Sequence, residues 1–140
     1  MAFTGNAFCT SAKVGFLTGT YTPLTDTMKI ALYTNLATLD ATTTAYTSSG
    51  EVVGTGYTAG GNTLVGNAIS YSGTTAWITF NNSSWTVATI TARGALIYDS
   101  SKSNAAIAVL DFGSDKTSTA STFTVQMPAA GATTALIRIA

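Results

Sequence analysis

Apolar and polar residues alternate with a period of two along much of the chain. In residues 27–33 (TMKIALY), Met28, Ile30 and Leu32 would share one face of a strand, and the residues between them the other face. Short apolar runs separated by Gly, Ser, Asn and Asp predict seven further strands, at residues 68–71, 76–80, 85–92, 95–98, 107–112, 123–127 and 135–139. Residues 72–75 (SGTT) are expected to form a hairpin turn.

Strands at intervals of roughly 10–15 residues, with turn residues between them, are typical of all-β sandwiches and barrels. We therefore predict that residues 1–140 form a single domain, an antiparallel β-sandwich or jelly roll of about eight strands. Residues 35–67 are rich in Thr and Gly and nearly uncharged. They are predicted to form a long excursion of loop and short edge strands, around Val52 and Leu64.

One short helix is predicted near the N-terminus, at residues 12–17. Thr10 or Ser11 would cap its start, and Gly19 would end it.

The composition agrees with a strand-rich protein. Thr accounts for 28 of the 140 residues, and only 9% of the residues are charged, compared with about 25% in typical globular domains. A β-branched Thr side chain packs well on a pleated sheet, and its hydroxyl tolerates solvent. Thr hydroxyls rather than charges are therefore expected to supply most of the polar surface.

The same composition argues against several functional classes. The chain has no His, so it lacks a Ser–His or Cys–His nucleophile pair and an imidazole base. Its single Cys cannot form a disulfide within the chain or a Cys-rich metal site. Two Arg and four Lys balance six acidic residues, so the chain has no net positive charge with which to attract a phosphate backbone. We expect neither an enzyme nor a nucleic-acid-binding protein, with no cofactor and no metal.

Two further patterns have simple structural interpretations. Residues 54–59 (GTGYTA) match the outline of a dinucleotide-binding loop, but Gly60 and Gly61 would break the helix that such a loop must open, so a turn is expected. The acidic residues stand mostly beside turn residues, and turn stabilisation is favoured over metal binding or catalysis even for Asp111 and Asp115, the closest pair in sequence.

Cys9 and the two Trp residues also have structural interpretations. Cys9 is expected to be a buried apolar residue. Trp77 and Trp85 are expected to pack in a core or an interface, with a sugar-binding platform as the alternative.

The candidate partner-binding residues are aromatic: Phe3, Phe8, Tyr46 and Tyr57. Phe3 and Phe8 lie in residues 1–9, which either tuck back onto their own domain or form an arm that docks on a neighbouring subunit. Tyr46 and Tyr57 lie in the 35–67 excursion, the second segment expected to contact a partner.

Four stretches, MAFTGNAFCTSAK, GTGYTAGG, ITARGALIYDSS and AVLDFGSDKTST, occur in this order along the chain. Together they resemble a family of small virion structural proteins of tailed bacteriophages, of the head-associated type, which includes capsid cement or decoration proteins and head fibres. The resemblance extends over nearly the whole chain. It implies a structural role, and no catalytic residue is carried over with it.

The resemblance implies a cement protein on the capsid surface, made in the host bacterial cytoplasm. It would bridge major capsid protein subunits and form a homodimer or homotrimer on a symmetry axis. The chain contains no apolar run of the roughly 18–20 residues that a membrane helix needs, so no membrane partner is expected. Two alternatives stay open: a tail, fibre or receptor-binding module that recognises host glycans, and a component of the head–tail connector.

Overall fold

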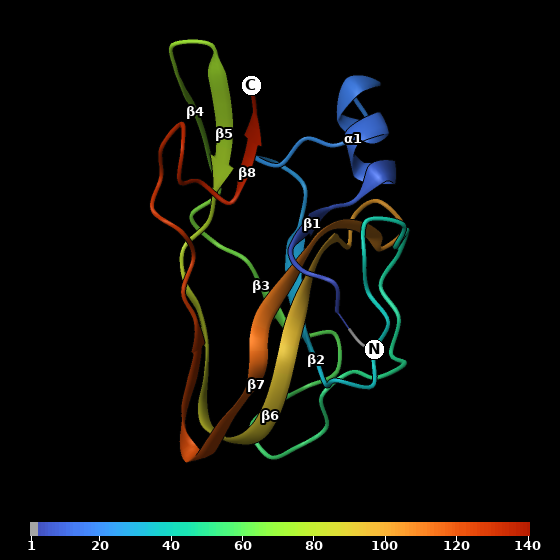
Figure 1. The fold of residues 1–140 in the computed structure, drawn as a ribbon, viewed down its shortest axis with the longest axis vertical. Helices are drawn as coiled ribbons and strands as arrows, with labels where there is room; N and C mark the ends of the chain where they lie inside the picture. The colour runs from blue at the N-terminus through green and yellow to red at the C-terminus, as the bar shows by residue number, and fades with distance from the viewer. Residues whose placement is uncertain (1–2) are drawn as a thin grey trace.

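The computed structural model describes residues 3–140, which contain one helix and eight strands (Figure 1). In chain order, the first seven strands are β1 (Ala7–Phe8), β2 (Met28–Tyr33), β3 (Asn62–Thr63), β4 (Ala68–Ser72), β5 (Thr75–Thr79), β6 (Ser83–Asp99) and β7 (Ala105–Val125). The eighth is β8 (Ile137–Ile139), and the helix is α1 (Thr10–Leu17).

The strands form two antiparallel sheets. The larger has the order β1-β7-β6-β2-β3, and the smaller has the order β4-β5-β8. The molecule is elongated, with the smaller sheet and α1 together at one end and the bend of β6 and β7 at the other (Figure 1). The predicted fold class, an all-β, sandwich-like protein with one short helix, is confirmed.

The predicted separation of the central strands was wrong. Residues 85–92 and 95–98 belong to one strand, β6, and residues 107–112 and 123–125 belong to β7. Gly94 does not break its strand: a Cβ there would lie 2.5 Å from the ring of Phe3 and 2.4 Å from the carbonyl oxygen of Leu110. Glycine at this position allows a close approach of neighbouring groups within a continuous ladder.

The long β6–β7 hairpin bends back on itself. The register shifts between Trp85 and Ala88 and again between Ala88 and Ile90, and irregularities of this kind increase local twist. Val87 and Ala120, on opposite strands of the bend, both adopt positive φ angles, 49° and 47°. The bend brings Phe112 and Phe123 of β7 together, with their ring centroids 6.4 Å apart.

The β2 strand is buried on both faces, although its alternating pattern would also suit a strand with one exposed face. The 35–67 excursion returns to β2 and contributes to this burial: the N–H of Val52 pairs along the strand edge by donating to the carbonyl of Leu32 (2.9 Å), and the buried Tyr33 donates from Oη to the carbonyl of Thr47 (2.6 Å). Within the excursion, β3 lies next to Leu64, and Glu51 forms a bridge with Tyr33. These are the two places where edge pairing was expected.

The helix lies where the sequence predicted it, but it begins at Thr10 instead of residue 12. Cys9 is its N-cap residue, and no side chain caps the helix, so the prediction that Thr10 or Ser11 serves as the cap was wrong. Thr18 closes the helix, and Gly19 follows with a φ of 74°, the left-handed conformation expected where a helix ends. The N-terminal segment just before the helix pairs with the large sheet through β1 and β7.

Candidate functional site

The smaller sheet has one apolar face that is only partly covered. Its register places Ile69, Ile78 and Ile137 in one cross-strand row and Tyr71, Ala76 and Ile139 in the next. Ile78 and Ile137 are buried, which places that part of the face in the core. The outer row is open: Tyr71 is 79% exposed and Ile139 is 54% exposed.

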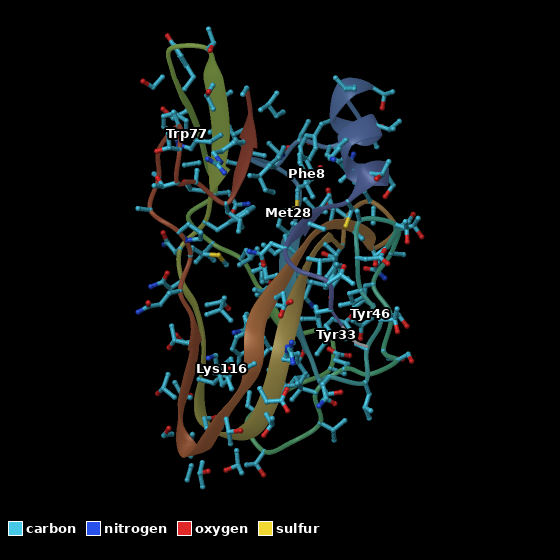
Figure 2. All side chains as sticks on the ribbon, viewed as in Figure 1. Phe8, Met28, Tyr33, Tyr46, Trp77 and Lys116 are labelled. Carbon is cyan, nitrogen blue, oxygen red and sulfur yellow. The ribbon has the colours of Figure 1, made fainter. Side chains whose placement is uncertain are left out.

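The α1 helix stands opposite this face and carries a chain of aromatic contacts. The rings of Phe8 and Phe16 meet edge to face with their centroids 5.8 Å apart, and those of Phe16 and Tyr21 do so at 5.4 Å. Figure 2 shows Phe8 between β8 and the helix. At the C-terminal end of the helix, Leu17 is 87% exposed.

Between α1 and the smaller sheet lies a set of connected hollows, which we call the apolar cleft. One hollow of about 290 Å³ is lined by Phe8, Lys13, Phe16, Leu17, Arg138 and Ile139. A second, of about 200 Å³, continues over Phe16, Tyr21, Pro23, Ile69, Ala76, Trp77, Ile78, Ile137 and Ile139. Leu17, Ile69 and Ile139, which line these hollows, are 87%, 49% and 54% exposed. An apolar hollow with exposed apolar walls is a candidate site for binding another molecule.

A third hollow extends the apolar cleft between the two sheets. It measures about 280 Å³ and is lined by residues 6–8, by residues 108–110 of β7, by Pro128 and by residues 134–138. The charged side chains that line these three hollows are both basic, Lys13 and Arg138. Lys13 Nζ lies 5.9 Å from the centre of the Phe8 ring.

The four candidate partner-binding residues do not lie together. Phe8 lies in the apolar cleft. Phe3 is only 3% exposed and forms a bridge with Leu39, so its ring is covered by its own chain. Of the two arrangements considered for the N-terminal segment, the structure has Phe3 tucked back onto its own domain.

Tyr46 and Tyr57 instead surround the buried carboxylate of Glu51. Tyr46 Oη donates to Oε2 of Glu51 (2.6 Å), Tyr57 Oη donates to Oε1 (2.7 Å), and the N–H of Gly60 also donates to Oε1 (2.7 Å). Burial raises the pKa of Tyr46 and Tyr57 above the ordinary value, and the hydrogen bonds to Glu51 add to this effect.

This Glu51 network has a structural explanation. The carboxylate accepts three donors, which satisfies a buried charge, and the hydroxyl of Tyr57 also accepts from the N–H of Leu32 (2.9 Å). The network therefore fastens the excursion to β2. Tyr98 adds to it by donating to the carbonyl of Gly60 (2.7 Å) and stacking on Tyr46, with ring centroids 4.9 Å apart.

Two acidic residues, Asp26 and Asp99, lie next to each other and join the loop after α1 to the end of β6. Burial raises the pKa of Asp99, and the neighbouring Asp26 raises it further. Burial alone would raise the pKa of Asp26 as well, but hydrogen bonds from Thr22 and the charge of Lys102 (3.8 Å away) bring it below the ordinary value. Asp99 Oδ1 accepts from Ser101 (2.6 Å from Oγ), so this pair also serves turns, as the sequence predicted for most acidic residues.

The remaining motifs are part of the fold. Residues 54–59 contain no helix, and Gly56 has a φ of 82°, consistent with the expected turn. Trp85 is 4% exposed and packs edge to face with Phe123 (6.3 Å between centroids). Cys9 is fully buried, as expected. In residues 3–140, no group of three or more potential metal-ligating side chains was found.

The apolar cleft itself was missed by the sequence reasoning. The strands of the smaller sheet were predicted, but their alternating apolar positions were interpreted only as core. The sequence did contain a signal for the cleft. The segments AISY, AWITF and ALIRI together have more apolar positions than one short helix can cover.

Comparisons with family models, with curated proteins and with solved structures find no match to this chain. Within residues 3–140, no helix is long and apolar enough to cross a membrane.

Proposed function

We propose that this protein is a structural protein of a tailed-bacteriophage virion: a capsid cement protein that lies on the shell and holds neighbouring major capsid protein subunits together. The structural observation that supports this role is the apolar cleft, an exposed apolar surface at one end of the elongated β-body. The resemblance of four ordered sequence stretches to head-associated virion proteins supplies the partner. Both are consistent with a homodimer or homotrimer on the capsid surface.

The physical demands on a cement protein agree with these features. Such a protein attaches by fitting a folded surface, and burying an exposed Leu or Ile side chain contributes about 1.5–3 kcal/mol before ordering costs. Leu17, Tyr71 and Ile139 are all more than half exposed and supply such surface. The formal net charge of zero means that crowded copies would not repel one another by net charge.

The Glu51 network supports a structural role over a catalytic one for this buried carboxylate. Its carboxylate is held by Tyr46, Tyr57 and the backbone of Gly60, and these donors occupy both carboxylate oxygens. A carboxylate engaged in this way stabilises the fold, whereas a general base needs a free oxygen within reach of substrate.

The proposal is tested on virions of the phage that encodes this chain. Cryo-EM should locate the protein on the capsid surface, bridging subunits, in a copy number that follows the number of shell subunits. Density at the tail tip alone would contradict the proposal, and one ring at the portal vertex would identify a connector component instead.

A matched pair of substitutions separates attachment from folding. Leu17→Asp, in the apolar cleft, should reduce occupancy on shells that lack the protein, whereas Val53→Asp, at a residue 95% exposed in the excursion, should leave occupancy unchanged. Attachment should weaken little between low and moderate salt, because apolar contacts are not screened. A steep salt dependence would indicate a charge-driven contact.

A tail or fibre module that recognises host glycans is the competing function. Because Trp85 is buried, the sugar platform would have to use the half-buried Trp77 of β5 (Figure 2). A glycan array with Trp77→Ala as the control distinguishes the two functions, since a cement protein should show no glycan binding that depends on Trp77.

A further inference from the structure

We infer that the apolar cleft binds an extended, acidic segment of the partner chain, which adds as a β-strand between β1 and β8. The identification of that partner as a capsid subunit rests on the proposed function. The binding mode itself rests on the geometry and charge of the cleft.

Two sheet edges border the cleft. β1 is the edge strand of the larger sheet, and β8 is an edge strand of the smaller one. The hollow of about 280 Å³, which we call the slot, is lined by Ala7 and Phe8 of β1 and by Ile137 and Arg138 of β8. An edge strand presents backbone N–H and C=O groups that lack a strand partner, and an extended segment can satisfy such groups on both sides at once.

Two apolar hollows adjoin the slot. The hollow beside Phe16 and Leu17 measures about 290 Å³, and the one over Tyr21 and Ile69 about 200 Å³. In a strand, residues two apart point to the same face and lie about 6–7 Å apart. A segment with apolar residues at alternate positions could therefore lie along the slot with its side chains in these hollows.

The charged side chains of the cleft are positive. Lys13 and Arg138 line the slot and the hollow beside it, and no carboxylate side chain lines any of these three hollows. Among the described residues, the ion pairs are Arg93 with Asp111 and Lys102 with Asp26, so neither cation of the cleft is neutralised by a neighbouring acid. Arg138 Nη1 donates to the carbonyl of Thr133 (2.5 Å), a neutral acceptor that leaves the positive charge uncompensated. Acidic residues between the apolar ones would complement both cations.

The test uses blocked synthetic peptides with the full-length protein. The acidic probe is acetyl-Thr-Ile-Asp-Ile-Asp-Ile-Thr-amide, and its matched partner has Lys in place of both Asp residues. A third peptide replaces the central Ile of the acidic probe by Pro, which removes a backbone donor and disfavours pairing. Binding is followed by NMR shifts of the backbone amides of Phe8 and of residues 136–139.

The acidic peptide should bind about 2- to 20-fold more tightly than the Lys peptide, since two exposed ion pairs contribute little each. The double variant Lys13→Gln/Arg138→Gln should abolish that preference. The matched control, Lys116→Gln, changes a cation near the other end of the molecule and should retain it (Figure 2). The Pro peptide should bind more weakly than the acidic peptide.

Three results would overturn the inference: no binding of the acidic peptide, equal binding of the Lys peptide, or shifts confined to the 35–67 excursion. Equal binding of the Pro peptide would overturn strand addition. Failure here is distinguishable from failure of the proposed function, because the location on the virion is measured independently. A protein found on the capsid that ignores these peptides retains the proposed function and loses this binding mode.

Discussion

The ring of Tyr21 occupies the space in which a Cβ atom of residue 15 would lie. A Cβ built on Gly15 would come within 2.0 Å of Cε2 of Tyr21, and Gly15 is buried. The Tyr21 ring also packs against Phe16 at 5.4 Å between centroids. Glycine in the middle of α1, an unfavourable helix former, thus allows the aromatic wall of the apolar cleft to close onto the helix.

Gly15→Ala should therefore destabilise the protein, by about 1–3 kcal/mol as for other overpacked sites. This loss is expected even though Ala favours a helix by about 1 kcal/mol relative to Gly. Urea unfolding measures the effect. In a Tyr21→Ala background the same substitution should be neutral or stabilising, and an equal loss in both backgrounds would show that Tyr21 is not the cause.

Phe3→Ala should cost about 3–5 kcal/mol of unfolding free energy, because the ring is 3% exposed and its removal leaves a cavity. Thermal unfolding of the isolated protein checks this. Leu36→Ala, at a residue 83% exposed, is the control and should change stability by less than about 0.5 kcal/mol. An unchanged Phe3→Ala monomer that fails to attach to shells would restore the arm interpretation.

Tyr57→Phe should destabilise the protein more than Tyr46→Phe. Both remove one donor from Glu51, but Tyr57 also accepts from the N–H of Leu32, which would then lack its partner. We expect a loss of about 0.5–1.5 kcal/mol for Tyr46→Phe and about 1–3 kcal/mol for Tyr57→Phe. Denaturant titrations of both variants measure the difference, and equal losses would contradict this account of the network.

The Cys9 thiol should resist modification in the folded protein. Burial raises its pKa to about 11, and the nearby Asp40 contributes in the same direction. At pH 8 roughly one thiol in a thousand would be ionised, and the thiolate is the reactive form. A thiol-specific chromogenic reagent should therefore react slowly at pH 8 and fully after unfolding in urea. Rapid reaction without denaturant would show that the site opens.

Asp111→Asn should lower stability at neutral pH and have little effect in strong acid. The N–H of Gly113 and the guanidinium of Arg93, 3.3 Å away, hold the pKa of Asp111 below its usual value. A carboxylate with a lowered pKa stabilises the fold above its unfolded pKa of about 3.9, and that contribution disappears as the pH falls through the folded value. Unfolding at pH 7 and pH 2.5 should show a gap of about 1 kcal/mol only at pH 7.

The alternation of apolar residues was sufficient to determine the strand-rich fold class, the β4–β5 hairpin and the strand at residues 28–33. These features depend on neighbours within a few residues, because alternation directly specifies two faces. The absence of His and the single Cys led to the expectation of a non-catalytic protein, which stays a prediction. The turn at residues 54–59 was recognisable from its glycines.

Tertiary structure decided what those local patterns could not. Whether Gly94 breaks a strand depends on Phe3, some 90 positions away in sequence, and whether Tyr57 faces a partner or Glu51 depends on how the excursion folds back. The apolar cleft likewise exists because β8, near the end of the chain, lies beside β1 and α1, near its beginning. Alternation identifies which residues share a face, but only long-range packing determines whether that face is covered.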